Sequence, residues 1–145
     1  MREKLRKYLL KNKMRQTPER FAILDKVLGL PRNFTATDVA AAMSDSEFRV
    51  SSATIYGALN LFIEAGILQK LVLKGGRAHY ELRSRTLSHI HLICEQCGKI
   101  KILNDPEFVA TMRAKRFQAF TTSYYTLNVY GICNDCARKK RKNHK

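Results

Sequence analysis

Apolar side chains recur at the spacing of amphipathic helices in four stretches of the first 66 residues. They predict four helices, the first around Leu5–Leu9 and the others opening at Thr17, Thr35 and Ser51. A proline follows Thr17, and an aspartate stands three residues after Thr35, as in a capping box; both are signals of a helix start. The fourth stretch has the most regular pattern, and Gly66 ends it.

The pattern after Gly66 changes to that of two short strands. Residues 68–73 and 78–82 are the predicted strands, and the charged, glycine-containing segment 74–77 is the turn of a hairpin. Helices followed by a basic hairpin predict a winged helix-turn-helix. In that arrangement the helix after the turn enters the major groove of DNA, and the hairpin lies near the backbone.

The second half of the chain predicts a smaller β-β-α-β unit. Residues 91–93 and 99–103 have strand patterns, and Tyr125, Leu127 and Val129 alternate as a third strand would. Between them, Asp105 and the following proline and glutamate predict a helix start. We expect its inward face to carry phenylalanines 108, 117 and 120 and Met112. The predicted fold class is α+β, a winged helix-turn-helix followed by a small α/β domain.

The four cysteines of the chain form two C-x-x-C pairs, Cys94/Cys97 and Cys133/Cys136. Two such pairs supply the four thiolates of a tetrahedral zinc site, and a closed shell of this kind is structural rather than catalytic. The alternative is two disulfides, which need an oxidising compartment. The N-terminus has no apolar signal segment, so we expect a cytoplasmic protein and zinc.

The composition favours a polyanionic partner. The 145 residues carry a formal net charge of +15 and are 45% hydrophobic, so the chain can build a core and still be strongly basic. A zinc ion on four thiolates lowers the total to about +13, which still favours nucleic acid. No apolar run approaches the ~20 residues of a membrane span, so no membrane contact is expected.

The exposed start of the predicted fourth helix carries hydroxyl groups that suit phosphates and base edges. The candidates for DNA contact on this helix are Ser51, Ser52, Thr54 and Tyr56, and the hairpin turn adds Lys74 and Arg77. Any amphipathic helix has a polar face, so the position of this helix before a basic hairpin is what favours DNA binding.

The segments 15–20, 52–59, 89–99 and 130–136 carry motifs that resemble those of the ferric uptake regulator family of bacterial metal-responsive regulators. The segment 15–20 is similar to the family's opening R-x-T-x-x-R, and 52–59 resembles its recognition helix. The string H-I-H-L-I-C-E-Q-C-G-K at 89–99 is the most specific match, and Y-G-I-C-N-D-C at 130–136 completes the pattern. The resemblance implies a homodimeric repressor that binds double-stranded operator DNA, with Arg15 and Arg20 among the contacts.

The resemblance implies a domain order as well. Residues 1–83 would form the winged-helix DNA-binding domain, 84–88 a hinge, and 89–137 a dimerisation domain with the structural zinc. The basic tail, 138–145, is predicted from its composition to be disordered and to add non-specific affinity for DNA, or simply solubility. No protein partner beyond a second copy is expected.

The resemblance also implies a regulatory metal, with Glu81, His89 and His91 as ligands. Two further family ligands are replaced here, one by Asn33 and one by Ile102. A second family site, within the dimerisation domain, is lost. His79 lies two residues before Glu81 on the same predicted strand face, which we expect to be polar; it is either a compensating ligand or a solvated residue.

Imidazoles and a carboxylate suit iron(II), zinc or manganese, so these residues alone leave the metal's identity open. Within the regulator class the alternatives are a metal-insensitive DNA binder with only structural zinc, and a haem- or peroxide-responsive relative. Gly57 replaces a usual arginine in the recognition helix, so the operator preference is expected to differ.

Two other classes compete with a regulator. An enzyme could use the histidines and Glu81 with a metal, but the sequence has no nucleophile elbow, phosphate-binding glycine loop or H-E-x-x-H helix, so no enzyme activity is expected. An architectural or RNA-binding zinc protein would lack an operator.

Overall fold

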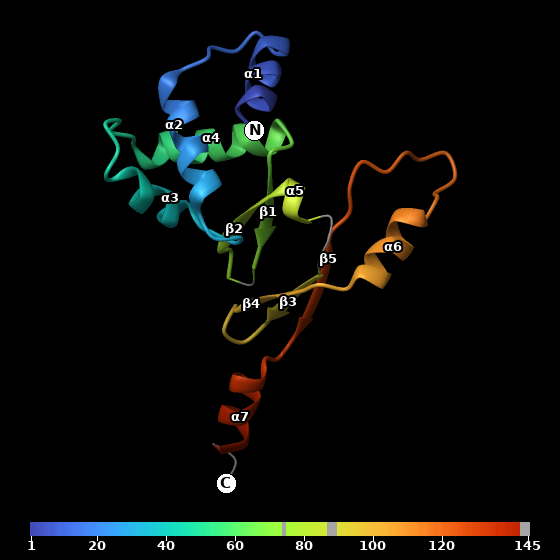
Figure 1. The fold of residues 1–145 in the computed structure, drawn as a ribbon. Helices are drawn as coiled ribbons and strands as arrows, with labels where there is room; N and C mark the ends of the chain where they lie inside the picture. The colour runs from blue at the N-terminus through green and yellow to red at the C-terminus, as the bar shows by residue number, and fades with distance from the viewer. Residues whose placement is uncertain (74, 87–89, 143–145) are drawn as a thin grey trace. The chain divides into compact units, whose positions relative to one another are not determined.

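The computed structural model describes residues 1–73, 75–86 and 90–142, with 85 and 86 described by their backbone alone. It divides the chain into two compact units, Met1–Ser84 and Arg85–Lys145 (Figure 1). The predicted hinge, 84–88, begins inside a short helix, α5 (Arg83–Thr86), and its last two residues lie outside the described part. Within the described residues, no helix has the length and apolarity that a membrane span requires.

The first unit has four helices and a hairpin, as the hydrophobic pattern predicts. Its elements are α1 (Arg2–Lys11), α2 (Pro18–Gly29), α3 (Ala36–Met43), α4 (Ser52–Glu64), β1 (Leu68–Val72) and β2 (Ala78–Leu82). The fold class, a winged helix followed by a small α/β unit, is confirmed by the order of these elements and of those in the second unit.

The helices begin where local chemistry satisfies their free N–H groups. The Thr35 hydroxyl accepts the Asp38 N–H over 3.3 Å and the Asp38 carboxylate accepts the Thr35 N–H over 2.7 Å, so the predicted capping box is present. The Ser51 hydroxyl likewise accepts the Thr54 N–H over 3.1 Å. Thr17 precedes a first-turn proline, but its side chain makes no capping hydrogen bond.

The wing contains a third strand segment that the sequence pattern does not reveal. β1 and β2 are antiparallel, with Gln69 opposite Glu81, and Phe34 bridges to Tyr80 on the other edge of β2. The Tyr80 N–H donates to the Phe34 carbonyl over 2.7 Å, and the two rings stack 6.0 Å apart. The segment before α3 is therefore fixed to the wing, and β2 is the middle strand.

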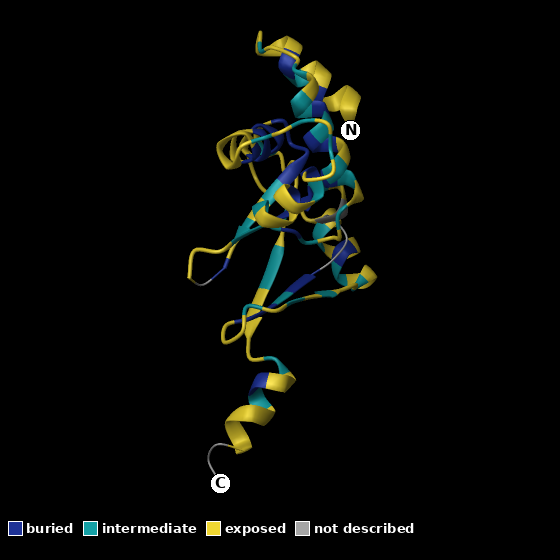
Figure 2. Ribbon diagram, turned by 90° about the vertical axis from the view of Figure 1, so that its left-hand side faces the viewer, coloured by how far each residue is buried: buried dark blue, intermediate teal, exposed yellow. Residues whose placement is uncertain are grey.

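A single apolar core fills the first unit (Figure 2). Every helix contributes to it, and the wing closes it with Leu68, Tyr80 and Leu82. Burying a side chain such as Leu59, which has no exposed surface, contributes about 1.5–3 kcal/mol. The α3–α4 pair and the wing are thus held by packing, so the outer face of α4 is free to carry polar residues.

The second unit is built on a three-stranded sheet in the order β4-β3-β5. Its elements are β3 (Ile90–Cys94), β4 (Ile100–Leu103), α6 (Pro106–Ala114), β5 (Leu127–Gly131) and α7 (Asn134–Lys142). β3 pairs antiparallel with β4 and parallel with β5. The predicted β-β-α-β order is confirmed.

The core of the second unit is small. Among the described residues, its buried apolar side chains are Ile90, Ile93, Val109 and two of the cysteines. The prediction that phenylalanines 117 and 120 face inward is wrong, because α6 ends at Ala114 and leaves them 51% and 70% exposed in the turn that follows. Apolar packing contributes much less to this unit than to the first.

The prediction of a disordered tail is wrong for residues 138–142, which continue helix α7. The second cysteine pair starts this helix, since the Ala137 N–H donates to the Cys133 carbonyl over 2.9 Å. Arginine and lysine are good helix formers, and an acid in the first turn with cations in the last turn suits the helix dipole. Residues 143–145 lie outside the described part.

Candidate functional site

The two cysteine pairs lie at the same end of the sheet of the second unit. Cys94 is the last residue of β3, and Cys133 follows β5 by two residues. β3 and β5 are parallel neighbours, with Cys94 opposite Gly131, so both strands finish at the same end of the sheet. A left-handed Gly98 (φ 72°) closes the first turn, and its N–H donates to the Cys94 carbonyl over 2.9 Å.

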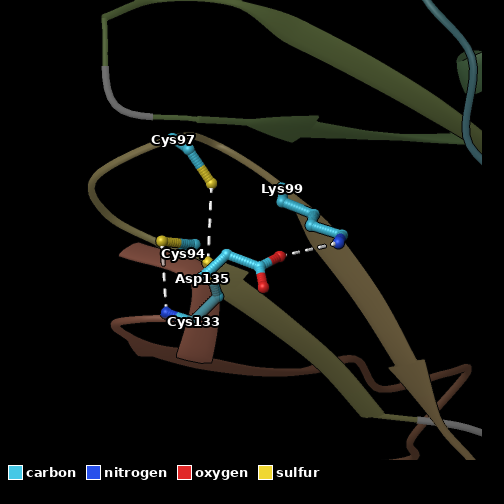
Figure 3. A network of polar contacts seen from close by, with 5 residues as sticks. All are labelled: Cys94, Cys97, Lys99, Cys133 and Asp135. Atoms are coloured by element: carbon cyan, nitrogen blue, oxygen red, sulfur yellow. Dashed lines mark hydrogen bonds and ion pairs between the residues drawn. The ribbon is translucent and has the colours of Figure 1, made fainter. Parts of the chain in front are cut away.

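The four sulfurs lie close together. Figure 3 shows three of the four cysteines, Cys94, Cys97 and Cys133. All four Sγ atoms of Cys94, Cys97, Cys133 and Cys136 lie within 4.8 Å of one another, and the Cys97 and Cys133 sulfurs are 3.8 Å apart. A tetrahedron with Zn–S bonds of ~2.3 Å has edges of about 3.8 Å. The donor set and the spacing therefore fit a zinc ion, which would neutralise thiolates and tie the ends of β3 and β5 together.

The same distances argue against the alternative of two disulfides. All four cysteines are free thiols, and the 3.8 Å between the Cys97 and Cys133 sulfurs is well beyond the ~2.05 Å of an S–S bond. Each sulfur is near all the others rather than near one partner. The cluster has the arrangement of a metal site.

Backbone N–H groups prepare part of the cluster for a cation. The N–H of Cys133 donates to the Cys94 sulfur over 3.3 Å, and this and the N–H of Cys97 lower the pKa of the Cys94 thiol to about 6. Hydrogen bonding to the Cys133 sulfur, together with burial, raises the pKa of the Cys136 thiol to about 12. At neutral pH the Cys136 proton must therefore leave when a metal binds.

The two units divide the predicted regulatory ligands between them. Glu81 and His79 belong to β2 of the first unit, and His91 belongs to β3 of the second; His89 lies outside the described residues. Glu81 and His91 are the buried polar side chains of the described chain, 3% and 1% exposed. Burying a carboxylate or an imidazole is costly unless hydrogen bonds or charges compensate it.

The wing face that carries Glu81 has polar residues, as predicted, but it is shielded from solvent: Glu81 is buried, and Gln69, opposite it on β1, is half-buried. His79 on the same strand is half-buried. Burial, and then the nearby charge of Arg77, lower the pKa of His79, so its imidazole is neutral at physiological pH.

The strand register surrounds His91 with side chains that coordinate metals poorly. Ile102 lies directly opposite His91 on β4, and Asn128 lies opposite it on β5. The resemblance placed an acidic ligand at the position of Ile102, so the residue closest in register to His91 is apolar here. An amide oxygen such as that of Asn128 is a weak ligand for iron or zinc, which prefer imidazole, thiolate or carboxylate.

The predicted DNA-contacting residues of α4 lie on its exposed face. Ser52, Thr54 and Tyr56 are exposed, the tyrosine by 52%. Ser51 is exposed too, but its hydroxyl bonds to the N–H and, over 2.9 Å, to the hydroxyl of Thr54. The side chains of Ser51 and Thr54 therefore bond to each other at the start of α4. The hydroxyl groups of Ser52 and Tyr56 are the better candidates to donate to DNA.

The positively charged candidates for DNA contact lie outside α4. Arg15 is exposed in the loop before α2, and Arg20, half-buried in α2, donates to the Arg15 carbonyl. Arg77 is exposed at the base of the wing turn. Lys74 lies outside the described residues. The first unit thus has exposed cations beside both α2 and the wing, as a helix that enters a DNA groove requires.

Sequence reasoning missed one exposed residue on the same face of α4, Asn60. Asn60 is exposed one turn after Tyr56, and Gly57 between them is exposed with no atom within 4 Å of where a Cβ would lie. With Arg20 and Arg49 they line an open groove of about 550 Å³. The helical spacing from Tyr56 to Asn60 is the signal that could have found this residue.

Comparisons with known proteins agree with this geometry. The Ferric uptake regulator family matches residues 11–130. The peroxide-responsive repressor PerR of Staphylococcus saprophyticus is 33% identical over 132 residues, covering 90% of this chain and 88% of the relative. The solved ferric uptake regulator from Pseudomonas aeruginosa with manganese has a TM-score of 0.73 at 26% identity, covering 87% of this chain and 95% of that one. The ferric uptake regulator from Francisella tularensis with iron has a TM-score of 0.61 at 26% identity, covering 86% and 95%.

The match spans both units, and the relatives are covered over most of their length. The recognition-helix motif and the first cysteine pair fall inside the matched residues, and the second pair, Cys133 and Cys136, follows directly after them. The chain belongs to the ferric uptake regulator family of metal-responsive transcription regulators.

Proposed function

We propose that this chain is a homodimeric transcription repressor that binds operator DNA in the cytoplasm in response to a divalent metal. The observation that carries the proposal is the exposed face of α4, with Ser52, Tyr56 and Asn60 presented by a helix whose other face is fully packed. Hydroxyl and amide groups on such a helix suit phosphate and base-edge contacts. Repression is favoured by the name of the PerR relative.

The two kinds of metal site would have separate tasks. Zinc on the four cysteines would hold the second unit folded and able to dimerise, since the binding energy of a structural metal is folding energy. Glu81, His89 and His91 are proposed to bind the regulatory metal, with His79 as a further candidate. The solved relatives with manganese and with iron support a first-row divalent metal, and iron(II), zinc and manganese all suit these ligands.

A metal-insensitive repressor is the second candidate, and a specific observation favours it. Ile102 stands opposite His91 in the strand register, where the family would supply an acidic ligand. A site reduced in this way binds metal more weakly, and DNA binding would then depend on the structural zinc alone. The peroxide-responsive alternative is supported by the name of one group of relatives and by no residue of this chain.

The decisive experiment combines metal analysis with DNA binding. Zinc-loaded protein is footprinted on its own promoter region with and without added iron(II), manganese or zinc. We expect a sequence-specific footprint that one metal strengthens by about 5- to 150-fold, the usual range of allosteric coupling. Binding without any footprint would favour the architectural alternative, and a footprint unaffected by every metal would favour the metal-insensitive one.

His91→Ala and His79→Ala form the matched pair for this experiment. Each removes one imidazole, but only His91 is buried. We expect His91→Ala to abolish the metal effect while the four-cysteine zinc stays bound. An unchanged metal effect in His79→Ala would exclude His79 as a ligand, and a weaker effect would identify it as one. If His91→Ala keeps both the metal effect and a metal content above one ion per subunit, His91 is not a regulatory ligand.

A further inference from the structure

More than half of the formal charge of the chain lies in the unit that the proposed function does not use for DNA. The second unit has 12 lysines and arginines against 4 acids, a formal charge of +8 out of +15. Five of these cations are consecutive, Arg138–Lys142, and all five are exposed on α7 (Figure 2). A dimerisation unit needs no such charge.

Helix α7 keeps these cations close together without neutralising them. None of the five takes part in an ion pair with any described residue, and the acid of the first turn, Asp135, pairs with Lys99 over 3.5 Å instead. Like charges three and four residues apart destabilise a helix by about 0.2–0.5 kcal/mol per pair. The arrangement costs stability, which a polyanion would restore.

The cysteine cluster anchors this helix. Cys136 is the buried residue of α7, and the helix starts on the Cys133 carbonyl through the Ala137 N–H. An isolated helix of nine residues with this charge would not form in water, because helices under about 12–15 residues are marginal. The four-cysteine site therefore presents the five cations as an ordered surface.

We infer that α7 is a second nucleic-acid surface, which binds the phosphate backbone of duplex DNA independently of sequence; the inference rests on the proposed DNA-binding function. From Arg138 to Lys142 the helix rises about 6 Å. A duplex carries about one charge per 1.7 Å, or three to four over that length. The cation density of α7 matches this density, and phosphate contacts need charge rather than shape.

The same residues argue against other partners. A helix that lies on a membrane needs an apolar face, whereas five consecutive cations occupy every side of α7. Protein interfaces have an apolar centre, and the helix offers only Ala137, which is half-buried. A phosphodiester backbone is the partner that this surface fits.

The test measures binding of the zinc-loaded full chain to a duplex that lacks the operator, over a series of salt concentrations. The variant K139Q/K140Q/K142Q removes three cations and keeps good helix formers. The control K101Q/R113Q/K115Q removes three exposed cations of the same unit outside α7. Zinc content and circular dichroism verify that both variants are folded.

We expect the α7 variant to bind the duplex about tenfold or more weakly, and its salt slope to fall by about 2–3, since each phosphate contact contributes ~0.9. The control should stay within about 1 of the wild-type slope. Equal losses in both variants, or no loss in the α7 variant, would overturn the inference. Stronger binding of the wild type to anionic vesicles or polyglutamate than to DNA would overturn it too. The operator footprint reports separately on the proposed function, because it depends on α4.

Discussion

The two units reach their folded states by different means. In the first unit four helices and a wing share one continuous apolar core, and side chains such as Leu59 and Phe62 have no exposed surface. In the second unit the buried apolar side chains are few, and two of them are cysteines of the metal cluster. Packing stabilises the first unit, and in the second unit a zinc ion on the four cysteines would take over that role.

This difference suits the two tasks. A packed core fixes the α3–α4 pair and the wing, so we expect the face of α4 that is proposed to contact DNA to be rigid with or without a metal. A unit that depends on zinc can be small, because the metal replaces the core that a short chain cannot build. The predictions below follow from this contrast.

Loss of one zinc ligand should have the largest effect. Cys97 is exposed, so Cys97→Ser leaves no cavity and acts through the metal alone. Structural zinc sites bind with about 10–16 kcal/mol, and we expect the variant to lose its zinc and the fold of the second unit. Gln96→Ser, in the same exposed turn, should change neither the zinc content nor the fold of the second unit. Zinc content and calorimetry measure both; a zinc-free Cys97→Ser protein with a wild-type melting profile would contradict the prediction.

A cavity in the first unit should be the next largest effect. Leu59→Ala removes a fully buried side chain from α4, and we expect a loss of about 2–5 kcal/mol in the free energy of unfolding of that unit. Leu10→Ala removes the same atoms from a side chain that is 61% exposed, and should cost less than about 0.5 kcal/mol. Urea unfolding measures the difference. If Leu59→Ala keeps its zinc while the first unit loses stability, the contrast between the two units is supported. Equal losses of unfolding free energy in Leu59→Ala and Leu10→Ala would contradict it.

Acidification should weaken zinc binding, since protons compete for the thiolates. At neutral pH the Cys136 thiol, with its pKa raised to about 12, must lose a proton, whereas Cys94, with its pKa lowered to about 6, is already a thiolate. Below pH 6 Cys94 adds one more proton to be displaced, so the loss of affinity should steepen there by about a further tenfold per pH unit. Competition with a chromophoric chelator measures the slope, and an affinity independent of pH would contradict it.

The smallest predicted effect is the loss of a helix cap. Thr35→Ala removes the hydroxyl that accepts the Asp38 N–H, and should cost about 1 kcal/mol of stability in the first unit. Thr37→Ala, exposed within the first turn of α3, is the control and should cost less than half as much. A cost equal to that of the control, measured by urea unfolding, would show that the cap contributes nothing.

Local patterns predicted most of the elements, because they depend on residues close in the sequence. The capping box of Thr35 and Asp38, the hairpin and the converging cysteine pairs follow from spacing alone. Phe34 could not be assigned to the wing, since its pairing with Tyr80 joins residues distant in the chain.

The wrong predictions for the second unit concern segments where one local sequence signal opposes another. Phenylalanines 117 and 120 look like core residues by hydrophobicity, yet α6 stops before them and they stay exposed. The run of cations at 138–142 has the composition of a disordered segment, yet the cysteine pair before it starts a helix. Neither outcome can be read from composition, since each depends on where a neighbouring helix begins or ends.

Hydrogen exchange with and without zinc tests the contrast between the units most directly. Backbone amides of the second unit, such as Glu95 and Ala137, and of the first, such as Val39 and Ile55, are all hydrogen-bonded to carbonyls. After complete chelation we expect the amides of β3, β5 and α7 to lose protection and those of α2, α3 and α4 to keep it. Protection retained in the second unit, or lost together in both, would contradict the claim that zinc holds one unit and packing the other.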